Sequence, residues 1–98
     1  MARQIIWTKR AQQERKEILS FWNNRNQTPT YSRKLDELIK DSLRLIGKFP
    51  SIGKPTNKEN VRVKILRNYH IIYQVTATEI IVLSIGDNRQ NSITSTTK

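Results

Sequence analysis

The sequence predicts an α+β fold in which a hairpin of two helices packs on a mainly antiparallel, four-stranded sheet, in the order β-α-α-β-β-β. Three observations predict it. A short apolar segment precedes two stretches of helical composition, a loop rich in Gly, Pro and Lys follows them, and three short apolar segments separated by turns come last. Ninety-eight residues suffice for a single core. We expect one domain over residues 1–91 and a polar, disordered tail over residues 92–98.

The first half of the chain contains the predicted first strand and both helices. Residues 4–7, QIIW, are rich in strand-forming residues, and Thr8 then provides an N-cap for a helix over residues 9–25, which lack Gly and Pro. Two glutamates, Glu14 and Glu17, interrupt its basic run, as is typical of a solvated helix face. The second helix is clearer because its apolar residues recur every three or four positions. These residues are Tyr31, Leu35, Leu38, Ile39, Leu45 and Ile46.

Specific residues mark the ends of the second helix and of the loop after it. Thr28 is expected to cap the second helix, and Pro29 to occupy its first position. Gly47 is placed to end the helix. Residues 47–60 contain two Gly, two Pro and three Lys, and we expect them to form a loop.

Three strands are predicted in the second half, at residues 61–67, 69–76 and 79–85, with tight turns between them. In the first of these strands, Val61, Val63 and Ile65 alternate with cationic residues. Alternation at period two sends the apolar residues to one face of the sheet and the cations to the other. We therefore expect an inner apolar face and a solvent-facing basic face. Tyr69, Ile71 and Tyr73 of the next strand share one face and are expected to be packing residues.

Charge and composition restrict the function. The chain carries 18 Lys and Arg against 8 Asp and Glu, which gives a net charge of +10. The positive electrostatic field of such a charge attracts nucleic acid or an acidic protein partner. With one His, no Cys and three isolated Gly, the sequence predicts no metal site, phosphate loop or cofactor. No apolar run matches a signal peptide or a membrane span, so we expect a soluble, cytoplasmic protein without a membrane partner.

The cations around residues 61–67 are the candidate site. Arg62 and Lys64 lie about 7 Å apart along a strand, a separation suited to neighbouring phosphates of one nucleic acid strand. Lys54, Lys58 and Arg67 could bind the same phosphates from either side. Such a cluster would hold a scissile phosphate and stabilise the charge that grows on it. The alternative is a solvated sheet face in a basic protein.

His70 is the one histidine of the chain. We expect a half-exposed strand residue on the face opposite Tyr69 and Tyr73. The alternative is an acid or base in the cleavage of a phosphodiester, although nothing in the sequence pairs His70 with a nucleophile.

Four segments together resemble the RelE/ParE superfamily of bacterial toxins from type II toxin–antitoxin systems. They are IIWTKRAQQERKEI, LRLIGKFPSIGKP, VRVKILRNYHIIYQV and IIVLSIGDNRQN. Their order and spacing, over about residues 5–91, carry the resemblance. It implies the β-α-α-β-β-β fold and a cognate antitoxin, acidic or amphipathic, that wraps the toxin.

The resemblance implies one of two activities. RelE-like members cut messenger RNA on the ribosome, where the 2′-hydroxyl attacks the adjacent phosphate, and ParE-like members poison DNA gyrase. Carried onto this chain, the resemblance assigns catalytic roles to Arg62, Lys64 and Arg89, and phosphate binding to Lys54. We expect ribosome-dependent cleavage of messenger RNA, with gyrase poisoning as the alternative. A non-toxic, basic nucleic-acid-binding module is a third hypothesis.

One departure from the RelE-like pattern concerns proton transfer. Many RNA-cutting members have a histidine or tyrosine after the last strand, where this chain has GDNRQNS. Asp87 is the acid of that stretch, but an aspartate is ionised at neutral pH and cannot donate a proton. Proton transfer contributes roughly 10²–10⁴-fold, so its loss could leave a weak nuclease. A lysine in a crowded cluster of Lys54, Arg62 and Lys64 could serve instead, since neighbouring cations favour its neutral form.

Overall fold

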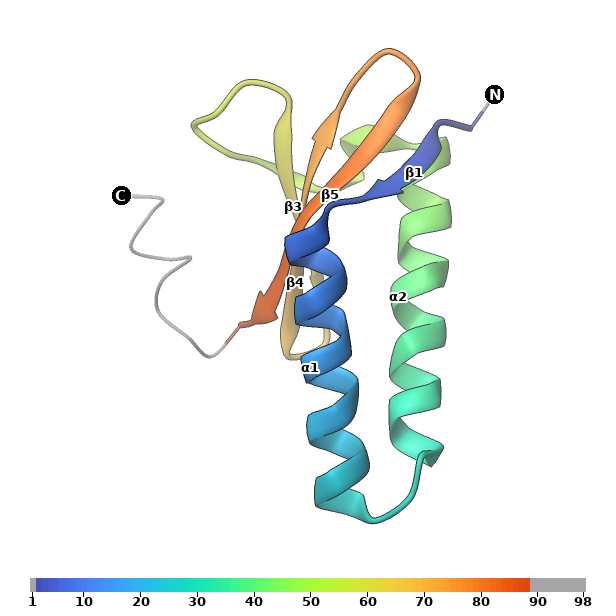
Figure 1. The fold of residues 1–98 in the computed structure, drawn as a ribbon. Coiled ribbons are helices and arrows are strands. Elements are labelled where there is room, and N and C mark those ends of the chain that lie inside the picture. Colours follow the sequence, from blue (N-terminus) through green and yellow to red (C-terminus); the bar gives the residue numbers. More distant parts are fainter. Residues whose placement is uncertain (1, 89–98) are drawn as a thin grey trace.

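The computed structural model describes residues 2–88, and its fold is shown in Figure 1. Its elements are β1 (Gln4–Trp7), α1 (Lys9–Asn26), α2 (Thr30–Lys48), the 3-10 turn η1 (Pro50–Ile52), β2 (Lys54–Pro55), β3 (Val61–Leu66), β4 (Tyr69–Val75) and β5 (Glu79–Asp87). The strand order in the sheet is β1-β5-β4-β3-β2, with β1 parallel to β5 and the other neighbours antiparallel. The predicted α+β class and element order are confirmed.

Some details of the predicted elements are wrong. Residues 47–60 are not all loop, because η1 and β2 lie within them and β2 pairs with β3 as a fifth strand. The cap of α2 is Pro29 rather than Thr28, because the Thr28 hydroxyl pairs with the hydroxyl of Thr30 instead of a backbone amide. The expected tail and Arg89 lie outside the described residues.

The Thr8 cap of α1 is confirmed, and it also attaches the helix to the sheet. Its hydroxyl accepts a hydrogen bond from the amide of Ala11 at 3.1 Å and donates one to the carbonyl of Val82 at 2.8 Å. An N-cap satisfies a helix amide that lacks an intrahelical partner. The start of α1 is therefore fixed to β5.

The prediction that Gly47 ends α2 is wrong, because the helix continues to Lys48. Its role is close approach to the chain before β1. The amide of Arg3 donates to the Gly47 carbonyl at 2.9 Å, and a Cβ on Gly47 would lie 3.1 Å from the Arg3 carbonyl oxygen. Glycine thus allows the end of α2 to pack against the first strand.

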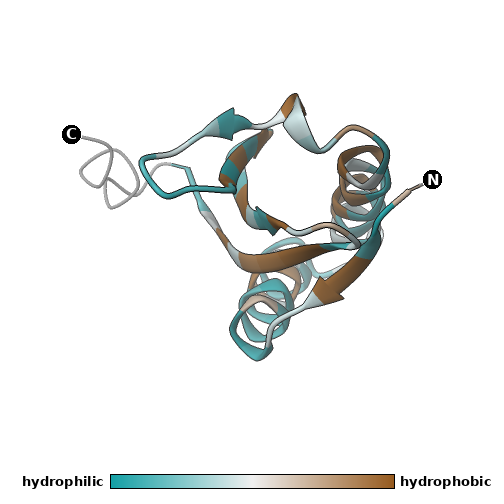
Figure 2. Ribbon diagram, turned by 90° about the horizontal axis from the view of Figure 1, so that it is seen from above, coloured by the Kyte–Doolittle hydropathy of each residue, from teal (hydrophilic) through white to brown (hydrophobic). Residues whose placement is uncertain are grey.

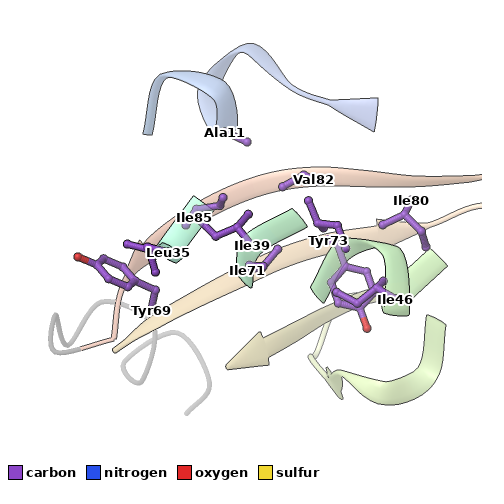
Figure 3. Close-up of a cluster of buried hydrophobic side chains, with 11 residues drawn as sticks. Ala11, Leu35, Ile39, Ile46, Tyr69, Ile71, Tyr73, Ile80, Val82 and Ile85 are labelled. Atoms are coloured by element: carbon purple, nitrogen blue, oxygen red, sulfur yellow. The ribbon is translucent and has the colours of Figure 1, made fainter. Parts of the chain in front are cut away.

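The core lies between the helices and the central strands (Figure 3). In Figure 2 the outer helix α1 is mainly hydrophilic, whereas long hydrophobic stretches follow the strands. Tyr69, Ile71 and Tyr73 of β4 are all buried, which confirms them as packing residues. The other core residues are Ala11, Leu35, Ile39, Leu43, Ile46, Ile80, Val82 and Ile85.

The predicted orientation of β3 is wrong. Arg62 pairs with Tyr73 and Lys64 with Ile71, and directly paired residues of an antiparallel sheet point to the same face. The cations therefore share the face of the buried β4 residues, whereas Ile65 is on the other face and 44% exposed. The reason is that β3 lies next to the border of the sheet, where long charged side chains can reach past the covered area.

Within residues 2–88, neither helix is both long and apolar enough to cross a bilayer.

Candidate functional site

Tyr73 binds the segment that precedes β2 to the middle of the sheet. Its side chain is fully buried, and its hydroxyl accepts a hydrogen bond from the amide of Gly53 at 3.0 Å and donates one to the carbonyl of Pro50 at 2.7 Å. Burial raises the pKa of Tyr73, although the Gly53 amide and the charge of Arg62 act in the opposite direction. The hydroxyl is therefore a neutral structural group.

Gly53 is required by the closeness of this contact. A Cβ at this position would overlap the Tyr73 hydroxyl and lie 2.9 Å from its Cε1 atom. Gly53 has an ordinary extended backbone, so the constraint is steric rather than conformational.

Arg62 holds the same segment from the neighbouring strand. Its Nη1 atom donates to the carbonyl of Gly53 at 2.7 Å and to that of Ser51 at 3.3 Å. Part of the guanidinium that the sequence assigned to phosphate thus binds the protein backbone. Arg62 and Lys58 also line a pocket of about 360 Å³ between η1 and the start of β3, which we call the β2–β3 pocket.

The other predicted cations do not form one cluster with Arg62. Lys64 follows Arg62 along the same face of β3, whereas Lys54 pairs with Val63 on the opposite face. Arg67 lies in the β3–β4 turn with a φ of 55° and lines a separate cavity against α2. The crowded cluster of Lys54, Arg62 and Lys64 expected from the sequence is therefore not formed on one face.

His70 is buried, so the expected half-exposed position is wrong. Only 6% of the residue is exposed, and it pairs across the sheet with Gly86 and Ile65. A Cβ on Gly86 would lie 2.8 Å from His70 Nε2. The ring thus lies over a position of β5 that has no side chain, and the glycine leaves room for it.

Burial lowers the pKa of His70, while a hydrogen bond with Asn88 and the charges of Glu14 and Asp87 act in the opposite direction. Its Nδ1 atom is buried and has no hydrogen-bond partner among residues 2–88. The environment therefore favours the neutral imidazole.

Acidic side chains gather beside this end of the sheet. Glu14, Glu17 and Asp87 line a groove of about 340 Å³ between α1 and the ends of β4 and β5, together with the exposed Phe21. The sequence context of Glu14 predicted a solvated helix face, and this prediction is wrong. One of its oxygens accepts hydrogen bonds from the Ser84 hydroxyl at 2.9 Å and the Ile85 amide at 3.1 Å.

No signal in the sequence indicates the role of Glu14. The carboxylate satisfies an amide of β5 beyond the point where β1 stops pairing with that strand. This contact depends on where the helix and the strand meet, and a charged residue within a basic run does not reveal it.

The two parts of the predicted site lie on opposite faces of the sheet. Arg62 and Lys64 share the face of Tyr73, whereas His70 shares the face of Ile65. A general acid or base must come within hydrogen-bonding reach of the reacting atoms. His70 therefore cannot transfer a proton at a phosphate held by Arg62 in this arrangement.

The comparisons with known proteins agree with this fold. The family model described as the ParE toxin of the type II toxin–antitoxin system parDE matches residues 5–92. The chain therefore belongs to the ParE toxin family, within the RelE/ParE superfamily, and is a toxin of a type II toxin–antitoxin system. The comparison with curated protein sequences gave no match.

Three solved structures share the fold at low sequence identity. A chain of the chromosomal ParDE system of P. aeruginosa has a TM-score of 0.73 and 19% identity, over 88% of this chain and 96% of that one. A double-arginine mutant of the E. coli toxin RelE in the free state has a TM-score of 0.67 and 20% identity, over 99% and 95%. A chain of the RelBE2 toxin–antitoxin complex of Mycobacterium tuberculosis has a TM-score of 0.63 and 15% identity, over 89% and 99%.

Proposed function

We propose that this toxin inhibits growth as a ParE-like poison of DNA gyrase and does not cut RNA. The observation that carries the proposal is the separation of Arg62 from His70 by the sheet. A poison needs a binding surface and no proton-transfer group, whereas a nuclease needs both in one place. The match to the ParE family model supports the same choice.

Arg62 also has a structural role at this surface. Its Nη1 atom is directed at two backbone carbonyls of its own fold. These bonds leave the N–H groups of Nε and Nη2 for a ligand. The arginine thus contributes to the shape of the surface, which suits a role in binding.

Ribosome-dependent cleavage of messenger RNA is the second candidate, and the β2–β3 pocket favours it. Lys58 and Arg62 line this pocket, and Lys64 follows on the same face of β3. These cations could stabilise a phosphate under attack by a 2′-hydroxyl. No histidine among residues 2–88 lies on this face beside Arg62, and without a positioned acid or base the rate would be roughly 10²–10⁴-fold lower.

The partner that neutralises the toxin would be an antitoxin with an acidic or amphipathic segment. The chain has a net charge of +10, so opposite charge on the partner would both accelerate association and select for it.

The two candidates are separated by inducible expression in bacteria, with growth, messenger RNA 5′ ends and the DNA-damage response followed over the first minutes. We expect growth arrest and DNA damage without new 5′ ends. New 5′ ends inside translated frames, lost in Arg62→Ala and Lys64→Ala, would establish the nuclease instead. Harmless expression would support a non-toxic binding module.

A matched control is Arg33→Ala, which removes an exposed arginine from the first turn of α2. It removes the same charge as Arg62→Ala without affecting the β2–β3 pocket. Circular dichroism of each purified variant would show whether a loss of toxicity reflects a loss of fold.

A further inference from the structure

An exposed aromatic side chain lines the groove between α1 and the ends of β4 and β5. Phe21 is 51% exposed, although its ring packs edge-on against Trp22 with 5.2 Å between the ring centroids. The other apolar side chains of the groove are Ile18, Tyr69 and Ile85. We call this feature the α1–β5 groove. Aromatic residues are enriched at the surfaces through which proteins bind one another.

The fold does not require an aromatic residue at position 21. The side chains of α1 that belong to the core or pack against it are Ala11, Ile18, Leu19 and Trp22. A polar residue in place of Phe21 would remove one ring contact with Trp22 and leave that core unchanged. The exposed ring is therefore available for a partner.

Negative charge gathers in the same groove, in a chain that is strongly basic. Glu14, Glu17 and Asp87 line the α1–β5 groove, and its lining contains no Lys or Arg. By contrast, Lys58 and Arg62 line the β2–β3 pocket. Because the chain as a whole has a net charge of +10, this groove differs in sign from the rest of the molecule. A matching occupant should combine cationic side chains with apolar ones.

The carboxylates of α1 are held in place within the fold. One oxygen of Glu14 accepts the bonds from Ser84 and Ile85 described above, and Glu17 accepts a hydrogen bond from the Gln13 amide group at 3.2 Å. Arg10 also pairs with Glu14 at 3.3 Å, but the arginine side chain is 74% exposed. An exposed pair of this kind contributes little, so a cation of a partner can replace Arg10 at small cost.

We propose that the α1–β5 groove is the surface through which the toxin binds gyrase, and that it takes a segment of that enzyme in which Lys or Arg stands beside apolar side chains. The inference rests on the proposed function as a gyrase poison. An enzyme that acts on DNA carries cationic surfaces that neutralise phosphates. A toxin with a net charge of +10 is repelled by such surfaces unless it presents its acidic groove to them.

Other occupants fit the groove less well. Nucleic acid would bring its phosphates against three carboxylates. A second copy of the chain would supply cations, but its own net charge of +10 opposes the approach of the two copies. In Figure 1 the helical hairpin projects beyond the sheet, at the end away from the loop between β2 and β3. A large partner can therefore reach α1 without contacting that loop.

The test uses purified gyrase and the purified full-length toxin, with inhibition of DNA supercoiling and direct binding by biolayer interferometry as the readouts. We expect Phe21→Ser and Glu17→Lys each to raise the toxin concentration for half-inhibition by at least about tenfold. Glu17 is exposed, so its variant keeps the test valid if Phe21→Ser lowers stability. Circular dichroism of each variant verifies the fold.

The matched controls lie on α2 and at its end. Glu37→Lys reverses an exposed charge of α2, and Phe49→Ser removes an aromatic side chain that is 56% exposed. Both should inhibit gyrase like the wild type. Binding by the wild type should also weaken with salt more steeply than binding by Glu17→Lys, because the variant has lost an attractive charge.

Each outcome separates the inference from the proposed function. Inhibition by the wild type that is unchanged in both groove variants would overturn the inference and leave gyrase as the target. A wild type that neither binds nor inhibits gyrase would overturn both. A wild-type dimer, measured by light scattering, that dissociates in Phe21→Ser would show that a second copy occupies the groove instead.

Discussion

The two ends of β4 are held in different ways. At the Tyr73 end, a buried hydroxyl and the Arg62 guanidinium bind the backbone of residues 50–53. At the Tyr69 end, the indole N–H of Trp22 donates to the Tyr69 hydroxyl at 2.6 Å, so the contact joins two side chains. His70 beside it packs over a glycine of β5.

The difference shows where single residues matter most. The segment at the Tyr73 end is short and contains no buried residue other than Gly53, so hydrogen bonds to specific backbone atoms must fix it. The Tyr69 end lies against α1, whose apolar side chains pack there as well. We therefore expect matched substitutions to be more harmful at the Tyr73 end.

The largest difference should come from the two glycines. Gly53→Ala places a methyl group against the Tyr73 hydroxyl, which two hydrogen bonds hold in position. We expect the free energy of unfolding to fall by about 2–4 kcal/mol, as measured by urea denaturation. Gly86→Ala meets the His70 ring, whose rotation can relieve the contact, and should cost about 1–2 kcal/mol. Equal losses would contradict the comparison.

The two tyrosines provide the next test. Tyr73→Phe leaves the Gly53 amide and the Pro50 carbonyl without their partner, and we expect a loss of about 2–3 kcal/mol. Tyr69→Phe removes the partner of the Trp22 indole N–H, which is only partly buried and can bind water. Its cost should be about 1 kcal/mol. The comparison fails if chemical denaturation gives Tyr69→Phe the larger loss.

Arg62 and Lys64 differ in the same way within one strand. Arg62→Met removes hydrogen bonds to two carbonyls but keeps much of the aliphatic stem, and we expect about 1–2 kcal/mol of destabilisation. Lys64→Met should change stability by no more than about 0.5 kcal/mol. Thermal unfolding of the purified variants measures both. A neutral Arg62→Met would mean that its contacts to the loop do not stabilise the fold.

The sequence predicted most of the fold because the strongest signals were local. The apolar residues of α2 recur at regular intervals, and Thr8 directly precedes the helix α1 that it caps. The short strand β2 escaped prediction because two residues, one of them proline, have no periodicity. Pairing with β3 defines that strand, and it is a tertiary contact.

The candidate site was less predictable. The face of the β3 cations and the exposure of His70 were predicted wrongly because both depend on pairing between segments far apart in the sequence. Alternation in β3 separated the cations from the valines, but only the register with β4 shows which face α2 covers. In the same way, the room for the His70 ring comes from Gly86 in the neighbouring strand. Neither fact is present in the local sequence.

The smallest effect should be a pH dependence confined to the Tyr69 end. Because burial lowers the pKa of His70 in the folded state, the unfolded chain binds more protons below the usual histidine pKa of about 6.5. The stabilisation is thus complete above that pH and is lost as the pH falls toward the folded-state pKa. Glu14 and Asp87 face the ring from α1 and β5 and weaken the effect by attracting the proton.

Urea denaturation at several pH values between 7 and 5 would measure this dependence in the wild type and in His70→Gln, which stays neutral throughout. We expect the wild type to lose stability on acidification and the variant to lose less. The Arg15 guanidinium lowers the pKa of Asp36, so the contribution of Asp36 is lost only at more acidic pH and does not overlap with this window. Identical slopes in the two proteins would show that the buried ring takes up its proton without cost, and the contrast between the two ends of β4 would then rest on packing alone.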